Sequence, residues 1–307
     1  MSVSEPVVVR EVGLRDGLQI LPRVLSTPHK LEWLRAAHGA GLREIEVGSF
    51  VPARLMPQLA DTAELVAFAR TLPGCVPSVL VPNLKGAERA IEARAYAMLV
   101  PLSASHAHSL ANMKRTPDEV VADIARIVDL RDAKGSDCLV EVGLSTAFGC
   151  TLQGRVEPAE VLRLVRAALD IGVDRIGLAD TVGYADPLQV KTLFEQAFAV
   201  AGERLHCAHF HDTRGLGAAN AFAAWQAGIR RFDACTGGLG GCPHAPGASG
   251  NVATEDLAYL FVSMGVSTGL DFDALMALRR QVGEWLAGEP LHGAVWRAGL
   301  PKTLRAA

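Results

Sequence analysis

The clearest chemistry in this sequence belongs to two histidines, His209 and His211, which lie one residue apart at the end of a short apolar run. Side chains alternate faces along a β-strand, so both imidazoles would project from the same side. Two imidazoles on one face can bind a single metal ion. The spacing favours a metal site; the plainer alternative is that one or both histidines are surface or hydrogen-bonded core residues.

Further ligands must come from other parts of the chain. Asp16 follows an apolar run near the N-terminus, and Asn251 follows a glycine-rich segment near the C-terminus. Carboxylate and amide oxygens beside two imidazoles suit a six-coordinate divalent ion such as Mg or Mn, whereas structural zinc sites use four nitrogen or sulfur ligands. We therefore expect Asp16, His209, His211 and Asn251 to be the candidate metal ligands.

Three more charged residues would meet this site if they follow strands that end at the same edge. Arg15 could stabilise negative charge on an enolate or thioester oxygen, or form only a salt-bridged strand end. Glu46 could orient Arg15 or a metal-bound water, or make a simple ion pair. Asp180 could be a supporting base, or merely cap the helix that follows.

A sixth cysteine stands apart from the other five. The segment 237–250 holds six glycines around Cys242, and we expect a mobile loop that brings a thiol to a bound substrate. A thiol titrates close enough to neutrality to donate or accept a proton. Cysteines inside or beside apolar runs are expected to be buried and reduced, because no CxxC pair and no secretory signal occurs.

Eight short apolar runs alternate with longer amphipathic segments, which is typical of a parallel sheet with a helix after each strand. We predict a single (β/α)8 TIM barrel, an α/β fold, with the candidate residues at the C-terminal ends of its strands. The predicted strands are Val7–Val12, Glu44–Gly48, Val76–Val81, Tyr96–Leu102, Cys138–Leu144, Arg175–Ala179, Leu205–His211 and Arg231–Cys235.

The intervening helices have recognisable ends. We predict helices over 30–40, 118–133, 158–171 and 187–200. The phrases HGAGLREIE, LDIGVDRIG and WQAGIRRFD each place a glycine just after a helix, as a C-cap requires. One more helix is expected from 271 to about 287. We thus predict a barrel domain over 1–270 and a helical extension over 271–307 that packs on it.

The amino-acid composition limits the kinds of molecule that this protein is expected to bind. The 307 residues are 50% hydrophobic and 21% charged, and the formal net charge is −3 without a long block of one sign. A nucleic-acid surface is therefore not expected. No stretch approaches the roughly twenty apolar residues of a membrane span, so we expect a cytoplasmic protein without a membrane partner.

Four segments together resemble the 3-hydroxy-3-methylglutaryl-CoA lyase family, which belongs to the metal-dependent TIM-barrel enzymes named for their Asp-Arg-Glu motif. These segments are 9–19, 45–50, 209–213 and above all 238–256, within a likeness that runs from about Val7 to Gly269. The resemblance implies cleavage of an acyl-CoA to acetyl-CoA and acetoacetate by retro-Claisen chemistry, a homodimer, and a place in leucine degradation.

The resemblance also assigns roles. It implies that Asp16, His209, His211 and Asn251 bind Mg or Mn. It implies that Arg15 stabilises the enolate, that Cys242 is the catalytic acid or base, and that Glu46 and Asp180 support the site. His209 or Asp16 would assist removal of the hydroxyl proton.

Three positions depart from the family pattern. Arg214 and Leu216 stand where tyrosine and glutamine are usual, and His106 stands where a glutamate is usual. We expect Arg214 and His106 near the mouth of the site, so they put the acyl group in question more than the reaction. A citramalyl-CoA lyase, which yields acetyl-CoA and pyruvate, is the nearest alternative.

Other classes remain open at this stage. Metal-dependent hydrolases also use a His-x-His pair, but commonly on the first strand. Condensing enzymes of the isopropylmalate-synthase type share the metal ligands but lack the cysteine loop and carry a longer C-terminal region. A non-catalytic barrel would have no need of a glycine-rich loop that carries a thiol.

Overall fold

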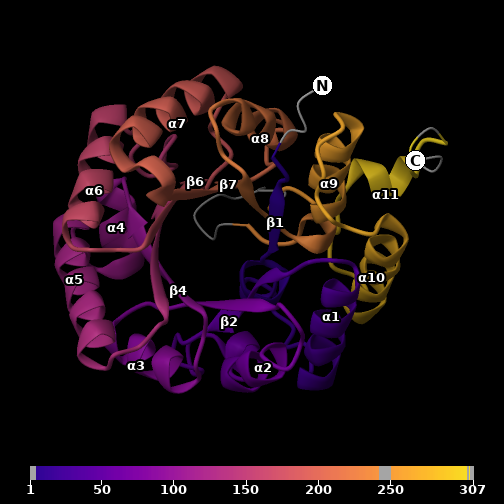
Figure 1. Ribbon diagram of the computed structural model, residues 1–307, viewed down its shortest axis with the longest axis horizontal. Helices are drawn as coiled ribbons and strands as arrows, with labels where there is room; N and C mark the ends of the chain where they lie inside the picture. Colours follow the sequence, from indigo (N-terminus) through magenta and orange to yellow (C-terminus); the bar gives the residue numbers. More distant parts are fainter. Residues whose placement is uncertain (1–4, 242–249, 303, 305–307) are drawn as a thin grey trace.

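The computed structural model describes residues 5–241, 250–302 and 304. Eight parallel strands form a closed barrel in chain order, and a ring of helices surrounds them (Figure 1). The strands are β1 Val8–Glu11, β2 Glu44–Ser49, β3 Val76–Leu80, β4 Ala97–Ser103, β5 Leu139–Ser145, β6 Arg175–Asp180, β7 Leu205–Phe210 and β8 Arg231–Ala234. The predicted TIM barrel is therefore confirmed, and each strand begins and ends within one or two residues of the expected position.

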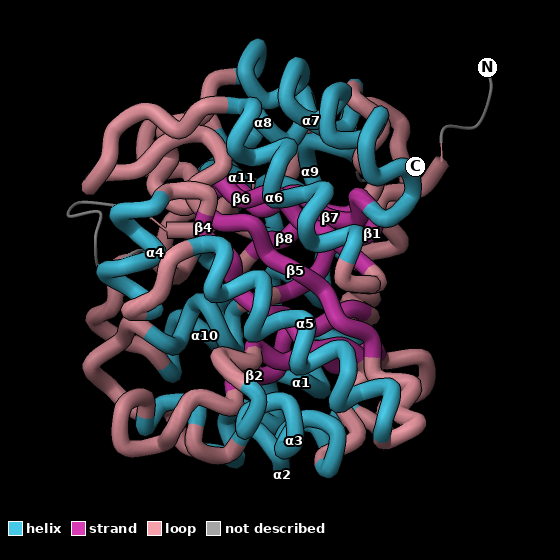
Figure 2. The backbone as a smooth tube through the Cα atoms, turned by 90° about the vertical axis from the view of Figure 1, so that its left-hand side faces the viewer, coloured by secondary structure: helices cyan, strands magenta, loops and turns pink. Residues whose placement is uncertain are grey.

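In the described part of the chain, eight α-helices lie between successive strands, two of them, α4 and α5, between β4 and β5. Three further described helices follow β8. In chain order, the helices are α1 Thr27–Gly39, α2 Thr62–Ala69, α3 Leu84–Glu92, α4 His106–Met113, α5 Pro117–Ala133, α6 Pro158–Asp170, α7 Pro187–Ala201, α8 Gly217–Gln226, α9 Thr254–Ser263, α10 Phe272–Trp285 and α11 Ala294–Ala298. The side view in Figure 2 shows the helices wrapped around the strands. No helix in the described ranges is long and apolar enough to cross a membrane.

Local sequence explains where several helices start. Thr116 and Glu119 form a reciprocal capping box at the start of α5, with Pro117 as the first helical residue. The Asp186 side chain accepts hydrogen bonds from the first backbone N–H groups of α7. Asp271 caps α10 in the same way. These caps satisfy N–H groups that a helix leaves unpaired, and so fix where each helix begins.

The glycines predicted just after three of the helices are also found there. Gly41, Gly172 and Gly228 follow α1, α6 and α8 with φ values of 97°, 82° and 103°. This left-handed conformation is costly for residues with a Cβ, which is why glycine ends these helices. The turn then leads directly into the next strand.

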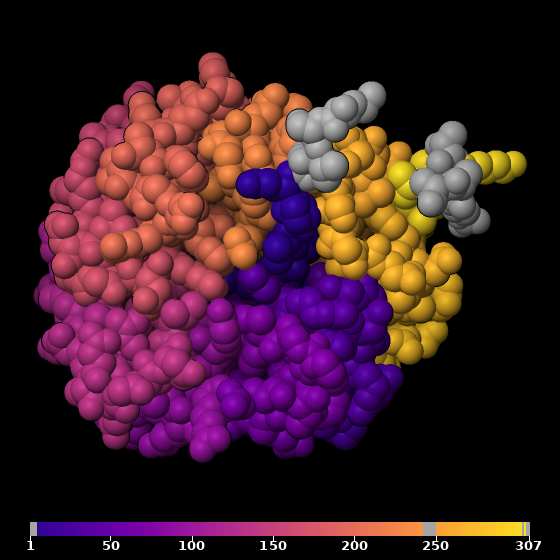
Figure 3. All heavy atoms as spheres, in the orientation of Figure 1, coloured from indigo at the N-terminus to yellow at the C-terminus, as the bar shows by residue number. Residues whose placement is uncertain are grey.

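The barrel closes where the start of the chain meets its last strand. β1 pairs with β8 in parallel, with Val8 opposite Arg231 and Glu11 opposite Ala234. In the space-filling view, the indigo start of the chain lies beside the orange and yellow segments (Figure 3). The loops after β1 and β8 are consequently neighbours, although they are more than 200 residues apart in sequence.

The helices after the barrel lie on one flank. α10, drawn in yellow in Figure 1, packs against α1 and begins one residue after the predicted position. Its Arg279 is buried and pairs with Glu255 of α9 at 3.1 Å. The predicted division into 1–270 and 271–307 stays a prediction, but these contacts show how the extension reaches the barrel.

Candidate active site

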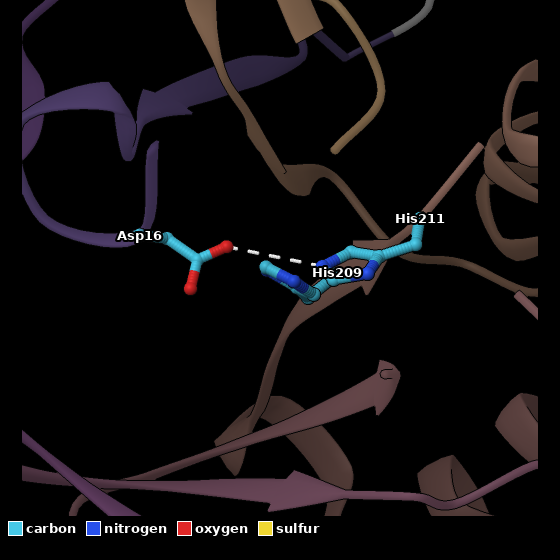
Figure 4. A group of neighbouring side chains, drawn as sticks. All are labelled: Asp16, His209 and His211. Carbon is cyan, nitrogen blue, oxygen red and sulfur yellow. Dashed lines mark ion pairs between the residues drawn. The ribbon is translucent and has the colours of Figure 1, made fainter. Parts of the chain in front are cut away.

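Asp16, His209 and His211 gather at the C-terminal end of the barrel. One ligand atom from each lies within 4.8 Å of the others, and Nε2 of His211 is 3.8 Å from Oδ2 of Asp16 (Figure 4). Asp16 sits on a buried π-helical turn, Gly13–Gly17, that directly follows β1. The two imidazoles extend from the end of β7 on the same side, with ring centroids 5.1 Å apart. The expected juxtaposition of the three residues is thus observed.

Asn251 completes this cluster. His211 lies just beyond β7 and forms an isolated antiparallel bridge with Asn251, which brings the loop after β8 over the site. The Asn251 amide donates from Nδ2 to Oδ2 of Asp16 at 2.6 Å and to the Leu239 carbonyl at 2.9 Å. Its Oδ1 is buried and has no hydrogen-bond partner among the described residues. A buried, unpaired amide oxygen beside a carboxylate and two imidazoles fits a divalent metal ion.

Two glycines let the chain approach these ligands. A Cβ on Gly240 would lie 2.4 Å from Nδ2 of Asn251, and Gly240 has a φ of 110°. A Cβ on Gly250 would lie 2.4 Å from the Gly238 carbonyl, at a φ of 97°. Both positions therefore require glycine on grounds of space and of backbone conformation. Part of the glycine richness of this segment is explained by close packing around Asn251.

Arg15 contacts both Asp16, one of the metal-site candidates, and Glu46. Its Nη1 donates to Oδ1 of Asp16 at 2.6 Å, and its Nε lies 2.7 Å from Oε2 of Glu46. Burial raises the pKa of Glu46 to about 7, although the charge of Arg15 acts in the opposite direction. Burial also disfavours ionised Asp16, but Arg15, His211 and His209 together outweigh it and hold the pKa of Asp16 well below its usual range. Asp16 is therefore an ionised carboxylate, as a metal ligand must be.

Asp180 is the last residue of β6 and is buried. Its two carboxylate oxygens accept hydrogen bonds from the backbone N–H groups of Tyr184 and Ala185, at 2.8 and 3.1 Å. The helix α7 is capped by Asp186 and not by Asp180. Asp180 therefore organises the turn that follows β6, at the same end of the barrel as the metal-site candidates.

The catalytic thiol expected from the sequence cannot be placed. Cys242 and the rest of 242–249 lie outside the described residues. The five described cysteines, Cys75, Cys138, Cys150, Cys207 and Cys235, are free thiols, and all but Cys75 are buried. Burial raises the pKa of Cys75 to about 11 and that of Cys138 to about 12, so neither thiol ionises near neutrality.

Asp233 is a site residue that sequence reasoning missed. It lies on β8, and its Oδ2 is 3.0 Å from Nδ1 of His209. Burial lowers the pKa of His209, but the hydrogen bond and charge of Asp233, together with the charge of Asp16, outweigh this and raise it. Burial opposes ionisation of Asp233 itself, yet Arg10 and His209 together hold its pKa well below the usual range. A partial signal was available, because Asp233 stands between the apolar Phe232 and Ala234, and a buried charged residue is almost always paired.

One cavity of about 1120 Å³ is lined by Asp16, His209 and His211. It reaches from Arg10 and Glu141 inside the barrel, past Arg15, to an apolar mouth that includes Leu55 and Met113. Such a volume is at the upper end of the range for small-molecule sites. The cluster is therefore accessible to an elongated ligand whose reacting end enters the barrel.

Arg214 and His106 were expected near the mouth of the site, but neither lines the cavity. Leu216, the third departure from the family pattern, does not line it either. Arg214 donates to the carbonyls of Val182 and Gly183, joining the loops after β6 and β7. His106 is exposed at the start of α4, whereas His108, two residues further on, is buried and lines the cavity. The phase of a short helix decides which of the two points inward.

Comparison with known proteins agrees with this geometry. The HMGL-like family matches residues 7–282. A Bacillus subtilis protein named hydroxymethylglutaryl-CoA lyase YngG is 36% identical, over 95% of this chain and 96% of its own length. A Chloroflexus aurantiacus protein named (R)-citramalyl-CoA lyase is 39% identical, over 96% and 95%. The solved structure of an HMG-CoA lyase from Acinetobacter baumannii, in complex with coenzyme A and 3-methylmalate, shares 40% identity and covers 98% of each chain with a TM-score of 0.92.

The fold and the site define a TIM-barrel lyase with a candidate divalent-metal centre. The chain belongs to the HMGL-like family. It is a carbon–carbon lyase of that family, so the hydrolase, condensing-enzyme and non-catalytic interpretations of the sequence are not retained.

Proposed function

We propose that this protein cleaves 3-hydroxy-3-methylglutaryl-CoA to acetyl-CoA and acetoacetate with the help of Mg²⁺ or Mn²⁺. The observation that carries the proposal is the cluster of Asp16, His209 and His211, which lines one cavity beside Arg15. Asn251 contacts Asp16 and adds an unpaired amide oxygen to this cluster. When bound there, a divalent ion would act as a Lewis acid toward the substrate's hydroxyl group.

The chain's own residues account for the rest of the reaction. Asp16, an ionised carboxylate that lines the cavity, takes the proton of the tertiary hydroxyl group, and His209 assists by holding that group in place. As the hydroxyl oxygen becomes a ketone, the bond between its carbon and the CH₂ next to the thioester breaks, and the electron pair forms a thioester enolate. Arg15 supplies positive charge for the enolate oxygen, and Glu46 holds the guanidinium in place.

The enolate must then gain a proton on carbon to give acetyl-CoA. We assign this transfer to Cys242, whose thiol has a suitable pKa range for the exchange. Asp180 takes no direct part: it fixes the turn after β6 through its two backbone hydrogen bonds.

Citramalyl-CoA is the second candidate substrate. Its cleavage breaks the same kind of bond, and the Chloroflexus relative carries that activity in its name. The relative from Acinetobacter was solved with a methyl-substituted hydroxydiacid, which also differs from a hydroxymethylglutaryl group. The two acyl groups differ by one CH₂ between hydroxyl carbon and distal carboxylate, so the choice depends on the depth of the cavity.

A direct assay tests both. The purified protein is incubated with Mg²⁺ or Mn²⁺ and, separately, hydroxymethylglutaryl-CoA or citramalyl-CoA, and acetyl-CoA, acetoacetate and pyruvate are measured. Asp16→Asn serves as the control, because it removes a charge from the cluster while keeping the side-chain shape. Release of acetyl-CoA with acetoacetate supports the first substrate, and release with pyruvate supports the second. If neither substrate is cleaved, both proposals fail.

Assembly and location follow from the same family relationship. We propose a homodimer that acts in the cytoplasm on an acyl-CoA, without nucleic-acid or membrane partners. Related lyases from rat and mouse are named as cytoplasmic. Analytical ultracentrifugation of the purified protein measures the oligomeric state, and a single monomeric species would contradict the dimer.

A further inference from the structure

Charged side chains occupy the barrel interior beneath the metal-site candidates. Arg10 of β1, Glu141 of β5 and Asp233 of β8 are each 5% exposed or less. The interior of a TIM barrel is normally filled by branched apolar residues in layers. Burying three charges there is costly unless each is paired, so their arrangement calls for a physical explanation.

Arg10 binds both carboxylates at once. Its Nε donates to Oδ1 of Asp233 at 2.7 Å, and its Nη2 donates to Oδ2 of the same carboxylate at 3.2 Å. Its Nη1 donates to Glu141 at 2.9 Å. A two-point contact between guanidinium and carboxylate fixes the plane of the carboxylate as well as its position. Arg10 therefore sets the orientation of Asp233.

Asp233 in turn contacts His209. Its Oδ2 lies 3.0 Å from Nδ1 of the imidazole, and its Oδ1 accepts a weak hydrogen bond from the Cys207 thiol at 3.2 Å. With a carboxylate on Nδ1, that nitrogen carries the proton and Nε2 is left to bind a metal ion. Three residues from β1, β8 and β7 thus form one chain of contacts that ends at the candidate metal site.

We propose that Arg10 is a positioning residue, which acts through Asp233 to hold the ring and the tautomer of His209 ready for metal binding. The inference deepens the proposed function and rests on its metal site. A lysine could neutralise the two carboxylates but could not grip Asp233 at two points, because an ammonium group is a single donor centre. The proposal therefore predicts that charge alone does not replace Arg10.

Glu141 offers a matched comparison. It is buried at the same depth and contacts Arg10 through the other side of the guanidinium, but no contact with Asp233 or His209 is observed among the described residues. If Arg10 serves only to balance buried charge, loss of either partner would have similar consequences. If it orients Asp233, loss of Glu141 would leave His209 largely unaffected.

The test compares four variants as purified metal-free protein: Arg10→Lys, Arg10→Met, Asp233→Asn and Glu141→Gln. Mn²⁺ affinity is measured by titration calorimetry, and the tautomer of His209 is read from ¹⁵N chemical shifts of its ring nitrogens. Melting temperatures show which variants are folded. If Arg10→Met does not fold, Arg10→Lys still tests the proposal, because its ammonium group keeps a positive charge beside the two buried carboxylates.

We expect Asp233→Asn to weaken Mn²⁺ binding by about 10- to 100-fold and Arg10→Lys by about 10-fold, with loss of the Nδ1–H tautomer of His209 in both. Glu141→Gln should stay within about 2-fold of the unchanged protein. An Arg10→Lys variant with unaltered affinity or an unaltered tautomer would overturn the inference, as would a Glu141→Gln variant that is equally impaired. If the unchanged protein binds no Mn²⁺, the proposed function fails instead, and the tautomer measurement still decides the role of Arg10.

Discussion

Nδ2 of Asn251 lies 2.6 Å from Oδ2 of Asp16, although 235 residues separate the two along the chain. The contact brings one side chain from near each end of the chain to a common centre. It also turns the amide so that Oδ1 is buried without a partner among the described residues. Asn251 therefore orients Asp16, and we propose that it also offers an oxygen ligand.

Replacing Asn251 with alanine is expected to weaken Mn²⁺ or Mg²⁺ binding by about 10- to 100-fold, because a ligand and a hydrogen bond to another ligand are lost together. Titration calorimetry measures the effect. Asn112→Ala is the matched control, since Asn112 lies in α4, lines the cavity beside Asp16 and is exposed. Equal metal affinity in Asn251→Ala and the unchanged protein would remove Asn251 from the ligand set.

Arg15→Met is expected to lower kcat by about 10²- to 10³-fold, the usual cost of removing one group that stabilises an oxyanion. Metal binding should change less, because Arg15 contacts Asp16 without being a ligand. Steady-state kinetics with the cleaved acyl-CoA provide the measurement. Arg214→Met serves as the control, since Arg214 contacts backbone carbonyls and does not line the cavity. A kcat within a few-fold of normal would contradict the assigned role.

Cys242→Ala is expected to lower turnover by about 10²- to 10⁴-fold, because a group positioned for proton transfer is lost. Metal affinity should be unchanged. Cys235→Ala is the comparison, a free thiol that is buried at the start of the same loop. Near-normal turnover in Cys242→Ala would refute the proton-transfer role.

Stability should depend on pH through Glu255. Burial raises the pKa of this carboxyl to about 7, so the folded protein binds a proton that the unfolded chain has already released above its ordinary value of 4.5. The free energy of unfolding therefore falls as pH rises from about 4.5 to about 7, by at most about 3 kcal/mol from this group. In Glu255→Gln this contribution disappears. Urea unfolding of both proteins between pH 5 and pH 8 measures it, and parallel curves would show that Glu255 does not titrate in this range.

Arg279→Met should destabilise the protein by about 3–5 kcal/mol, because it leaves buried Glu255 without its cation. The loss should be smaller below pH 7, where Glu255 takes up a proton. Chemical unfolding measures the difference, with exposed Arg280→Met as the adjacent control. An unchanged midpoint would mean that α10 is held by apolar packing alone.

Most of the barrel could be predicted because strands buried on both faces are continuous apolar runs, and because glycine marks the helix ends. The same logic placed Arg15, Asp16, Glu46, Asp180 and both histidines together, since parallel strands finish at one edge. The interior partners were harder to find. Arg10 and Asp233 lie within strands, and only three-dimensional register shows that a charge on β1 faces one on β8.

Local geometry set the remaining limits. Residues 13–17 form a buried π-helical turn that the sequence pattern did not predict, and Asp16 lies on it. His106 was singled out, but the phase of α4 directs His108 inward instead. Successive side chains on an α-helix point about 100° apart. The sequence of the eight-residue helix α4 does not determine which of its side chains faces the cavity.

The pairing of β1 with β8 has a consequence for synthesis. When the first 200 residues have been synthesised, the chain contains Asp16 but not yet His209, His211 or Asn251. A metal ion can therefore contribute binding free energy to folding only once β8 has paired with β1. A metal ion that binds the complete barrel and not its fragments would stabilise only the last step of folding. The free energy of unfolding of the newly made enzyme would then rise with the concentration of the ion.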